Sequence, residues 1–459
     1  MRVRERAVLE IVVIGLGYVG IPVAALFADV EGFHVTGVQR RSKRSGWKID
    51  HINRGKNPIE GEEPGLAELI ERVVEKETFR ATDDITVYGE ADAILIAVQT
   101  PVDKNHIPRY ESLRQVSQDI ARHMKKGALV VLESTVAPGT TDYVVKPILE
   151  EQSGMKAGVD FNLVFSYERV MLGRLLHNLT KLDRIVGGIT PECTRRGVEF
   201  YSHIVEAKLH ATDSLTAEVA KVTENTYRDV NIAFANEVAL ICESLGVDVH
   251  EVRRYVNSLP NIPGDPAKNP LRMMHIPGAG VGGHCLPKDP WLLKYGLDAY
   301  GDFKFEPRVI IESRRINDSM PSHMVTLIGE ALNKKKLKMK DAKVALLGVA
   351  FLPNSDDTRN TPTYPLYNLL KERGADVMVH DPYVEEYEDM KIGNDLEATV
   401  LGSDAIVLVT RHDEYKEMSL DWLRGKMRTP VIVDGRNNFR REECLEAGFT
   451  FRGVGIPRK

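Results

Sequence analysis

The sequence predicts an α/β protein in which two doubly wound domains are joined by a long central helix and a small helical domain. Three observations predict this fold. Short apolar segments rich in β-branched residues recur in the first third of the chain and again in its last third, as buried parallel strands do. A long segment with apolar residues at helical spacing lies between them. The length of 459 residues favours two or three domains over one.

The first domain is predicted over residues 1–205, a central domain over residues 206–325 and a last domain over residues 326–459. The central domain begins with a helix from Thr212 to Leu245, and proline and glycine then cluster between Leu259 and Pro290. The strands expected in the first domain are Glu10–Ile14, His34–Val38, Ala93–Val98, Ala128–Glu133 and Asn162–Ser166. Those expected in the last domain are Lys343–Leu347, Asp376–His380, Ala405–Thr410 and Pro430–Asp434.

Composition excludes several classes of partner. A formal net charge of −5 argues against sequence-independent nucleic-acid binding, which needs a basic surface. No apolar run approaches the roughly 20 residues that span a membrane, and the first ten residues lack the apolar segment of a signal peptide. The cysteines form no CxxC pair that would indicate a metal site or a disulfide framework. We therefore expect a cytoplasmic protein with no metal, nucleic-acid or membrane partner.

The segment GLGYVG follows the first expected strand and opens a helix, which is the context of a dinucleotide fingerprint. Its glycines permit a tight turn and a close approach of the backbone to a pyrophosphate at the helix N-terminus. The first domain is therefore predicted to be Rossmann-like and to bind a nicotinamide dinucleotide. The candidate contacts in this loop are Gly15, Gly17, Tyr18, Val19 and Gly20.

The choice between NAD and NADP depends on the end of the second expected strand. An acid about 20 residues after the fingerprint usually binds the adenosine ribose hydroxyls, and this chain has Gln39 there. The basic residues that follow, Arg44 among them, would also suit a 2′-phosphate. NAD is expected and NADP stays open.

Two loops that follow strands are expected where cofactor and substrate meet. They contain Thr100, in Gln-Thr-Pro, and Thr135, in Ser-Thr-Val. Each hydroxyl could bond phosphate, ribose or nicotinamide, or could instead cap a helix.

The segment GAGVGGHCLPKDP, from Gly278 to Pro290, presents a cysteine behind a glycine-rich bend. Glycine lets the backbone approach a ligand closely. Cys285 could then attack a carbonyl carbon and hold it as a thioester, with Asp289 four residues further on. The competing interpretation is a glycine-rich surface loop with an incidental cysteine.

Lys221, Asn225 and Arg228 share one face of the expected long helix, since they are spaced i, i+4 and i+7. Such a polar row is costly to bury without a polar ligand. The alternative is a solvated face paired with Glu218 and Glu224.

The motifs resemble one family, the nucleotide-sugar 6-dehydrogenases, which contains UDP-glucose dehydrogenase and UDP-N-acetylmannosamine dehydrogenase. The match runs nearly end to end. The cysteine motif, HC followed by DPW, resembles the members that act on N-acetylated sugars, above all UDP-N-acetylmannosamine. The motifs, in the family's order, are GLGYVG, QTP, STVAPGTT, SYERV, AEVAKVTENTYRDVN, GVGGHCLPKDPW, GVAFLPNSDDTRNTP and DGR.

The resemblance implies oxidation of a C6 hydroxymethyl group to a carboxylate by two NAD in turn, on a UDP-sugar held by the last, also Rossmann-like, domain. It also implies a homodimer or higher homo-oligomer. It identifies Cys285 as the nucleophile, Lys221 as a proton-transferring or oxyanion-stabilising residue, and Asn225, Asp289, Glu168 and Thr135 as further catalytic residues. Arg359 is placed near the cofactor. The implied substrate-binding residues are Glu168, Arg169, Val170, Lys221, Asn225, Arg228, Arg272, His275, Gly282, Phe351, Leu352 and Arg436.

The chain departs from the family's pattern at several positions. Tyr167 stands where a proline usually precedes the glutamate, Leu352 replaces a lysine, and Gln39 replaces an acid. The expected His-x-Arg pair before the cysteine is out of register, with Arg272 and His275 nearby. The sugar therefore stays open, with UDP-glucose and UDP-N-acetylglucosamine as alternatives to UDP-N-acetylmannosamine.

Two other functions compete with this hypothesis. A single-step dehydrogenase of the hydroxyacid type would not need Cys285. A non-catalytic protein that senses a nucleotide sugar or NAD would have no use for a presented nucleophile. The intact set of Lys221, Asn225, Cys285 and Asp289 favours the four-electron enzyme over both.

Overall fold

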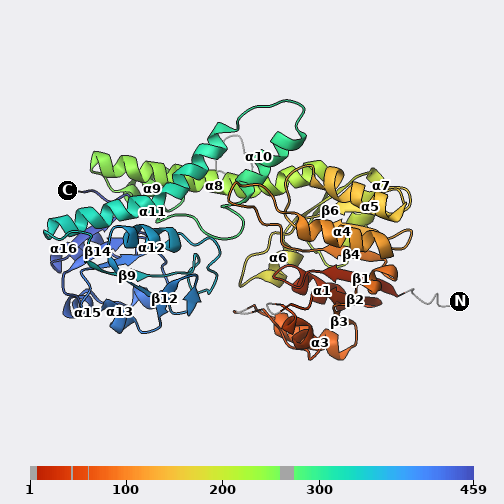
Figure 1. Ribbon diagram of the computed structural model, residues 1–459, viewed down its shortest axis with the longest axis horizontal. Coiled ribbons are helices and arrows are strands. Elements are labelled where there is room, and N and C mark those ends of the chain that lie inside the picture. Colours follow the sequence, from red (N-terminus) through yellow and green to blue (C-terminus); the bar gives the residue numbers. More distant parts are fainter. Residues whose placement is uncertain (1–7, 43–44, 60, 62, 259–272, 459) are drawn as a thin grey trace. The chain divides into compact units, whose positions relative to one another are not determined.

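The computed structural model describes residues 8–42, 45–59, 61, 63–258 and 273–458 (Figure 1). The chain forms two compact units. Unit 1 comprises Met1–Glu224 with Trp291–Phe305, and unit 2 comprises Asn225–Pro290 with Glu306–Lys459. The boundaries fall inside two helices, α8 (Ser214–Leu245) and α10 (Asp289–Tyr300), which contribute residues to both units.

Unit 1 is built on an eight-stranded sheet with the order β3-β2-β1-β4-β5-β6-β7-β8. Neighbouring strands are parallel, except β6 and β7, which are antiparallel. The order reverses direction between β1 and β4, and ligands of such sheets bind beyond the carboxyl ends of the strands at this reversal. The strands are β1 (Leu9–Ile14), β2 (Phe33–Val38), β3 (Phe79–Thr82), β4 (Ala93–Ile96), β5 (Leu129–Leu132), β6 (Asn162–Phe165), β7 (Arg184–Gly188) and β8 (Leu209–Asp213).

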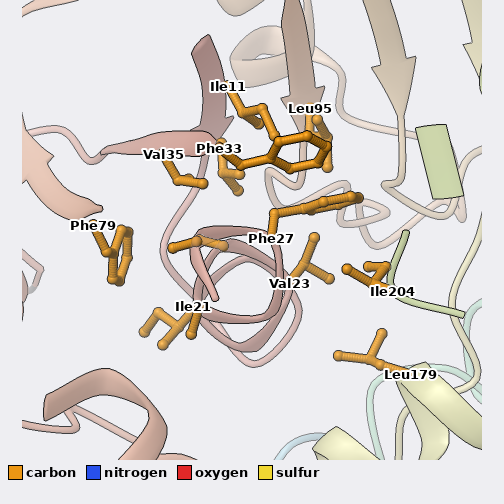
Figure 2. Close-up of a cluster of buried hydrophobic side chains, with 14 of the residues drawn as sticks. Ile11, Ile21, Val23, Phe27, Phe33, Val35, Phe79, Leu95, Leu179 and Ile204 are labelled. Carbon is orange, nitrogen blue, oxygen red and sulfur yellow. The ribbon is translucent and has the colours of Figure 1, made fainter. Parts of the chain in front are cut away.

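The core of unit 1 fixes α1 against the sheet. Figure 2 shows Phe27 on the side of α1 that faces Ile11 and Leu95, and the Phe27 ring stacks on Phe200 with centroids 4.3 Å apart. Because α1 begins at the end of the glycine loop, this packing also fixes the loop. The helices of this unit are α1 (Gly20–Ala28), α2 (Trp47–Ile52), α3 (Leu66–Glu75), α4 (Glu111–His123), α5 (Lys146–Ser153), α6 (Leu175–Lys181) and α7 (Pro191–Tyr201), with short turns η1 (Ile85–Gly89) and η2 (Thr141–Val145).

Unit 2 is built on a seven-stranded sheet with the order β11-β12-β10-β9-β13-β14-β15, parallel except for the β11–β12 pair. Here the order reverses between β9 and β13. The strands are β9 (Lys343–Leu347), β10 (Asp376–His380), β11 (Glu386–Tyr387), β12 (Met390–Gly393), β13 (Ala405–Leu408), β14 (Val431–Asp434) and β15 (Thr450–Gly453). The helices that lie wholly in this unit are α9 (Val249–Val256), α11 (Arg308–Lys334), α12 (Thr363–Glu372), α13 (Leu396–Val400), α14 (Asp413–Lys416), α15 (Leu420–Lys426) and α16 (Arg441–Glu446).

The predicted fold class is confirmed, with two doubly wound sheets and a long helix between them in sequence. Every expected strand is present, with ends that differ by up to two residues. The long helix begins at Ser214 because Thr212 and Asp213 belong to β8. Sequence reasoning missed β3, β7, β8, β11, β12 and β15, which are short and mostly lie toward the edges of the sheets. The three-domain division stays a prediction.

A buried carboxylate ties α8 to the loop that follows β5. Glu218 is fully buried, and its carboxylate accepts hydrogen bonds from the Gly139 backbone N–H (2.6 Å), the Thr141 N–H (2.8 Å) and the Thr141 hydroxyl (2.7 Å). Glu218 therefore does not pair with a solvated face of Lys221, Asn225 and Arg228, and that part of the alternative is wrong. Burial raises the pKa of Glu218 to about 7, although the three hydrogen bonds oppose the shift.

This pKa predicts a pH-dependent stability. Because the folded-state pKa is raised above the ordinary value of 4.5, the group's stabilising contribution is fully present below that value and is lost as pH rises through about 7. We compare the free energy of unfolding of the wild type with that of the Glu218→Gln variant. The difference, wild type minus variant, should decrease as the pH rises from about 5 to about 8. Urea unfolding at each pH measures it, with the exposed Glu237→Gln on the same helix as control. A difference that does not change with pH would contradict the assignment.

Candidate active site

The glycine loop of unit 1 has the geometry of a nucleotide cradle. Gly15 has φ +98°, and a Cβ there would lie 2.6 Å from the Ala97 carbonyl oxygen. A Cβ on Gly20 would lie 2.0 Å from the Gly15 oxygen, so both positions require glycine. A Cβ on Gly17, in contrast, would meet no described atom within 4 Å. No side chain among the described residues caps α1 at Val19, so the open side of the loop lies at a helix N-terminus suited to phosphate.

Gln39 follows β2 and holds the glycine loop itself. Its side-chain oxygen accepts a hydrogen bond from the Leu16 N–H (2.9 Å), and its amide donates to the Ser45 hydroxyl (3.1 Å). Arg41 forms ion pairs with Asp50 (3.7 Å) and Asp83 (3.3 Å). The predicted contact Arg44 lies outside the described residues.

The two threonine loops meet. The buried Thr100 hydroxyl donates to the Thr135 carbonyl oxygen over 2.6 Å, and the neighbouring Ser134 hydroxyl donates to the Val98 oxygen (2.7 Å). The hydroxyl of Thr100 therefore joins two loops beyond the carboxyl ends of β4 and β5 instead of capping a helix. Thr135, which is half-buried, belongs to the same junction.

Lys221 is buried in unit 1 beside the SYERV segment. Its ammonium donates to the Glu168 carbonyl oxygen (2.8 Å) and lies 3.5 Å from the Glu168 carboxylate. The ammonium also lies 5.1 Å from the centroid of the Tyr167 ring, within the range of a cation–π contact. The tyrosine that replaces the family's usual proline therefore forms one wall of the lysine site.

The neighbours of Lys221 are held by a second ion pair. Arg169 pairs with Glu224 (3.0 Å) and donates to the Asp183 carbonyl oxygen (2.7 Å). The Tyr167 hydroxyl also donates to Glu224 (3.3 Å). The Val170 N–H donates to the Glu168 carboxylate (2.5 Å), which orients that acid.

Cys285 lies in unit 2 at the approach to α10. Its carbonyl oxygen accepts hydrogen bonds from the N–H groups of Lys288 (3.0 Å) and Asp289 (2.9 Å), so the cysteine begins the turn that leads into α10. The Asp289 carboxylate accepts a hydrogen bond from the Asn225 side-chain amide at 2.6 Å. The structure therefore brings together three of the predicted catalytic residues within this unit.

Lys288 is a residue that sequence reasoning missed. It is 4% exposed, and its ammonium lies 3.9 Å from Asp289. Its position between the cysteine and the aspartate in CLPKD could have indicated Lys288 as a site residue. Burial, together with the positive charges of Lys288 and Arg359, lowers the pKa of His284 to about 3. A neutral His284 cannot act as the charged partner of a Cys285 thiolate.

The glycine loop before Cys285 packs against the segment that follows β9. A Cβ on Gly282 would lie 2.5 Å from the Phe351 Cβ, and one on Gly283, at φ +93°, would lie 2.9 Å from the Phe351 ring. Arg436 donates to the carbonyl oxygens of Val409 (2.6 Å) and Gly280 (3.2 Å). Phe351 and Arg436, both predicted to bind substrate, therefore also shape the cysteine loop.

The remaining predicted residues lie as follows. Leu352 is 37% exposed, and Arg359 forms a bidentate pair with Asp357 (2.8 and 2.5 Å). Arg228 is exposed. The pKa of His275 is lowered first by the burial of His275 and then by the positive charge of Arg228, so these two residues lie near each other. Arg272 lies outside the described residues. The described residues contain no group of three or more candidate metal ligands.

The sequence profile of one family matches the chain in three parts. The NAD binding domain of the UDP-glucose/GDP-mannose dehydrogenase family matches residues 9–205, its central domain residues 215–319, and its UDP binding domain residues 345–441. The chain belongs to this family. The resemblance inferred from the motifs is therefore confirmed, and the chain is an NAD-dependent nucleotide-sugar dehydrogenase, an oxidoreductase.

Relatives within the family differ in the sugar that their names carry. A UDP-N-acetyl-D-mannosamine dehydrogenase from Pyrococcus horikoshii is 37% identical over 447 residues, covering 97% of this chain and 99% of that protein. The crystal structure of an NDP-N-acetyl-D-galactosaminuronic acid dehydrogenase from Methanosarcina mazei Go1 has a TM-score of 0.89 and 44% identity, covering 98% and 96%. A UDP-glucose dehydrogenase structure from Pyrobaculum islandicum has a TM-score of 0.83 and 26% identity, covering 99% and 100%.

The open position at Gly17 yields a test of the cofactor site. Because a methyl group there meets no described atom, Gly17→Ala should fold normally and obstruct only the pyrophosphate. We expect its Kd for NADH to rise at least about tenfold, a cost of about 1.4 kcal/mol, with an unchanged Tm. Gly20→Ala is the contrasting variant, since its Cβ collides with the backbone and should lower the Tm. NADH fluorescence titration measures the binding, and an unchanged Kd for Gly17→Ala would contradict the placement.

Proposed function

We propose that this protein oxidises the C6 hydroxymethyl group of a UDP-N-acetylhexosamine to a carboxylate through a covalent intermediate on Cys285. The observation that carries the proposal is the placement of Cys285 in the turn that leads into α10, where its carbonyl oxygen bonds the N–H of Asp289 and the Asp289 carboxylate bonds Asn225. The thiolate is the reactive form of a cysteine.

The chemistry balances with two cofactor molecules. NAD, when bound at the glycine loop, accepts one hydride in each of two oxidations. After the first oxidation the substrate is an aldehyde, and the Cys285 thiolate adds to its carbonyl carbon to form a thiohemiacetal. Loss of a second hydride gives a thioester. Water then attacks the thioester carbon, the C–S bond breaks, and the carboxylate and the thiol are released.

The other residues have roles that follow from charge. Oxyanions arise at the alcohol, the thiohemiacetal and the hydrolysis steps, and the Lys221 ammonium and the Asn225 amide are suitable donors to them. The carboxylates of Asp289 and Glu168 can accept a proton from the attacking water. Phe351, Gly282 and Arg436 are proposed to hold the UDP-sugar, and Arg359 and Thr135 to lie near the cofactor.

UDP-N-acetylmannosamine is the substrate we propose first. It is the sugar named for relatives such as the Pyrococcus horikoshii enzyme, and the HC and DPW residues around Cys285 resemble those of members that act on N-acetylated sugars. The solved Methanosarcina mazei enzyme supports a second candidate, an N-acetylgalactosamine nucleotide. Trp291, the tryptophan of DPW, stacks on His106 with centroids 3.9 Å apart, so its indole is held in unit 1.

Replacement of the nucleophile tests the covalent mechanism. Cys285→Ser should fail to complete the four-electron oxidation, because an alkoxide is a poorer trap and a poorer leaving group than a thiolate. The measurement is the number of NADH formed per sugar together with the carboxylate product. Normal uronate production would contradict the mechanism, one NADH per sugar in wild type would indicate a two-electron enzyme, and none would indicate a binding protein.

A panel of nucleotide sugars tests the substrate. A pocket that bonds the acetamido group loses affinity for a sugar without it, because its polar groups are left unpaired, so kcat/KM for UDP-glucose should be lower than for UDP-N-acetylmannosamine by at least about 10²-fold. The panel includes the N-acetylglucosamine and N-acetylgalactosamine nucleotides. Equal turnover of UDP-glucose, or a preference for another epimer, would overturn the sugar assignment and leave the chemistry unchanged.

We propose a homodimer, or a higher homo-oligomer, that assembles through α8. Tyr227, Phe234 and Ile241 are spaced by seven residues, so they share one face of the helix, and they are 68%, 56% and 50% exposed. An exposed apolar row of this kind usually marks an interface. We expect light scattering at micromolar concentration to give at least a dimer, and Phe234→Glu to weaken it. A wild-type protein that is monomeric and fully active would contradict the proposed assembly.

The described residues include no helix that is both long and apolar enough to span a bilayer. All four cysteines are free thiols, which supports a reducing compartment. We therefore propose a cytoplasmic location.

A further inference from the structure

The loop that carries Cys285 is attached at its beginning to a buried amide. The Gly278 N–H donates to the Asn236 side-chain oxygen (3.0 Å), and the Asn236 amide in turn donates to the Asn317 side-chain oxygen (2.8 Å). Asn236 lies on α8 and Asn317 on α11. Two helices thus hold the first residue of the loop through one continuous chain of hydrogen bonds.

The same chain reaches the other end of the loop. The Asn317 amide donates to both the backbone oxygen (3.0 Å) and the carboxylate (2.9 Å) of Asp229 on α8. Asp229 forms an ion pair with Arg314 on α11, and the Arg314 guanidinium also lies 3.4 Å from the Leu286 carbonyl oxygen. The network of Asp229, Asn236, Arg314 and Asn317 therefore contacts the loop on both sides of Cys285.

These four side chains are buried. Their exposed fractions are 0% for Asp229 and Arg314 and 1% for Asn236 and Asn317. Burying an ion pair and two amides is costly, and such groups are weak evidence for stability alone. A glycine-rich loop has large conformational freedom, and partners outside the loop must restrict it if the thiol is to have one position.

We propose that Asp229, Asn236, Arg314 and Asn317 are positioning residues that fix the Cys285 thiol for attack on the aldehyde. The proposal rests on the covalent role proposed above. It follows that the network matters for the second oxidation, which needs the thiol, far more than for the first, which does not. Loss of the network should let the aldehyde intermediate escape before it is trapped.

Asn317→Ala is the principal test, because it removes the contacts to both Asn236 and Asp229. We expect kcat for oxidation of the supplied 6-aldehyde to fall by about 10²-fold, the scale of a misplaced reacting group, while the first oxidation and the KM for NAD change little. Aldehyde released during turnover of the alcohol is captured with a carbonyl reagent and counted per NADH. This ratio does not depend on how much of the enzyme is folded.

Two further sets of variants separate positioning from general stability. Asn236→Ala and the double variant with Asn317→Ala should release aldehyde to the same extent as Asn317→Ala, because the two residues act in series. Asp229→Asn is compared with the control Asp404→Asn. Asp404 is a buried acid that pairs with Arg428 and accepts a hydrogen bond from the Lys343 N–H at the amino end of β9. Aldehyde should be released by the Asp229→Asn variant and not by the Asp404→Asn variant.

The outcomes distinguish this inference from the function on which it rests. If Cys285→Ser releases aldehyde but Asn317→Ala slows both oxidations equally and releases none, the positioning role is wrong and the covalent mechanism stands. If Cys285→Ser makes uronate normally, the covalent mechanism itself is wrong.

Discussion

The hydrogen bond between the Asn225 amide and the Asp289 carboxylate is the contact on which the site depends. It joins α8 to the first turn of α10, and the same turn is closed by the carbonyl oxygen of Cys285. Cys285 is thus connected through Asp289 to a long helix. α8 also contains Lys221, which we propose as a donor to oxyanions.

The two α/β units use the residue after their second strand in the same way. In unit 1 the Gln39 side chain accepts a hydrogen bond from the Leu16 N–H in the glycine loop. In unit 2 Asp381 accepts from the N–H groups of Val349 (2.6 Å) and Ala350 (2.9 Å), in the loop after β9. The loop of unit 1 leaves Gly17 open for a pyrophosphate, whereas the loop of unit 2 presents Phe351 to the cysteine segment. One topology therefore supports two different ligand surfaces.

Buried charged side chains hold one loop in each unit. Glu218 holds the loop after β5, and the pair of Asp229 and Arg314 holds the loop of Cys285. A well-packed apolar core would provide stability at lower cost than either arrangement. Such groups can fix the position of a loop. A charged or amide side chain can bind the backbone of a glycine-rich loop, which has few side chains of its own to pack.

The sequence by itself determined the fold class and the glycine loop of the cofactor, and it predicted Cys285, Asp289, Asn225 and Lys221 as the reactive set. These features are local, since strand periodicity, the spacing of glycines and the i, i+4 rows of a helix are written in neighbouring residues. Only the tertiary structure revealed Lys288 as a buried cation beside Asp289, the Tyr167 ring beside Lys221, and the network from Asp229 to Gly278. Those contacts join residues up to 88 positions apart, and no local pattern specifies which distant polar groups will meet when the helices pack.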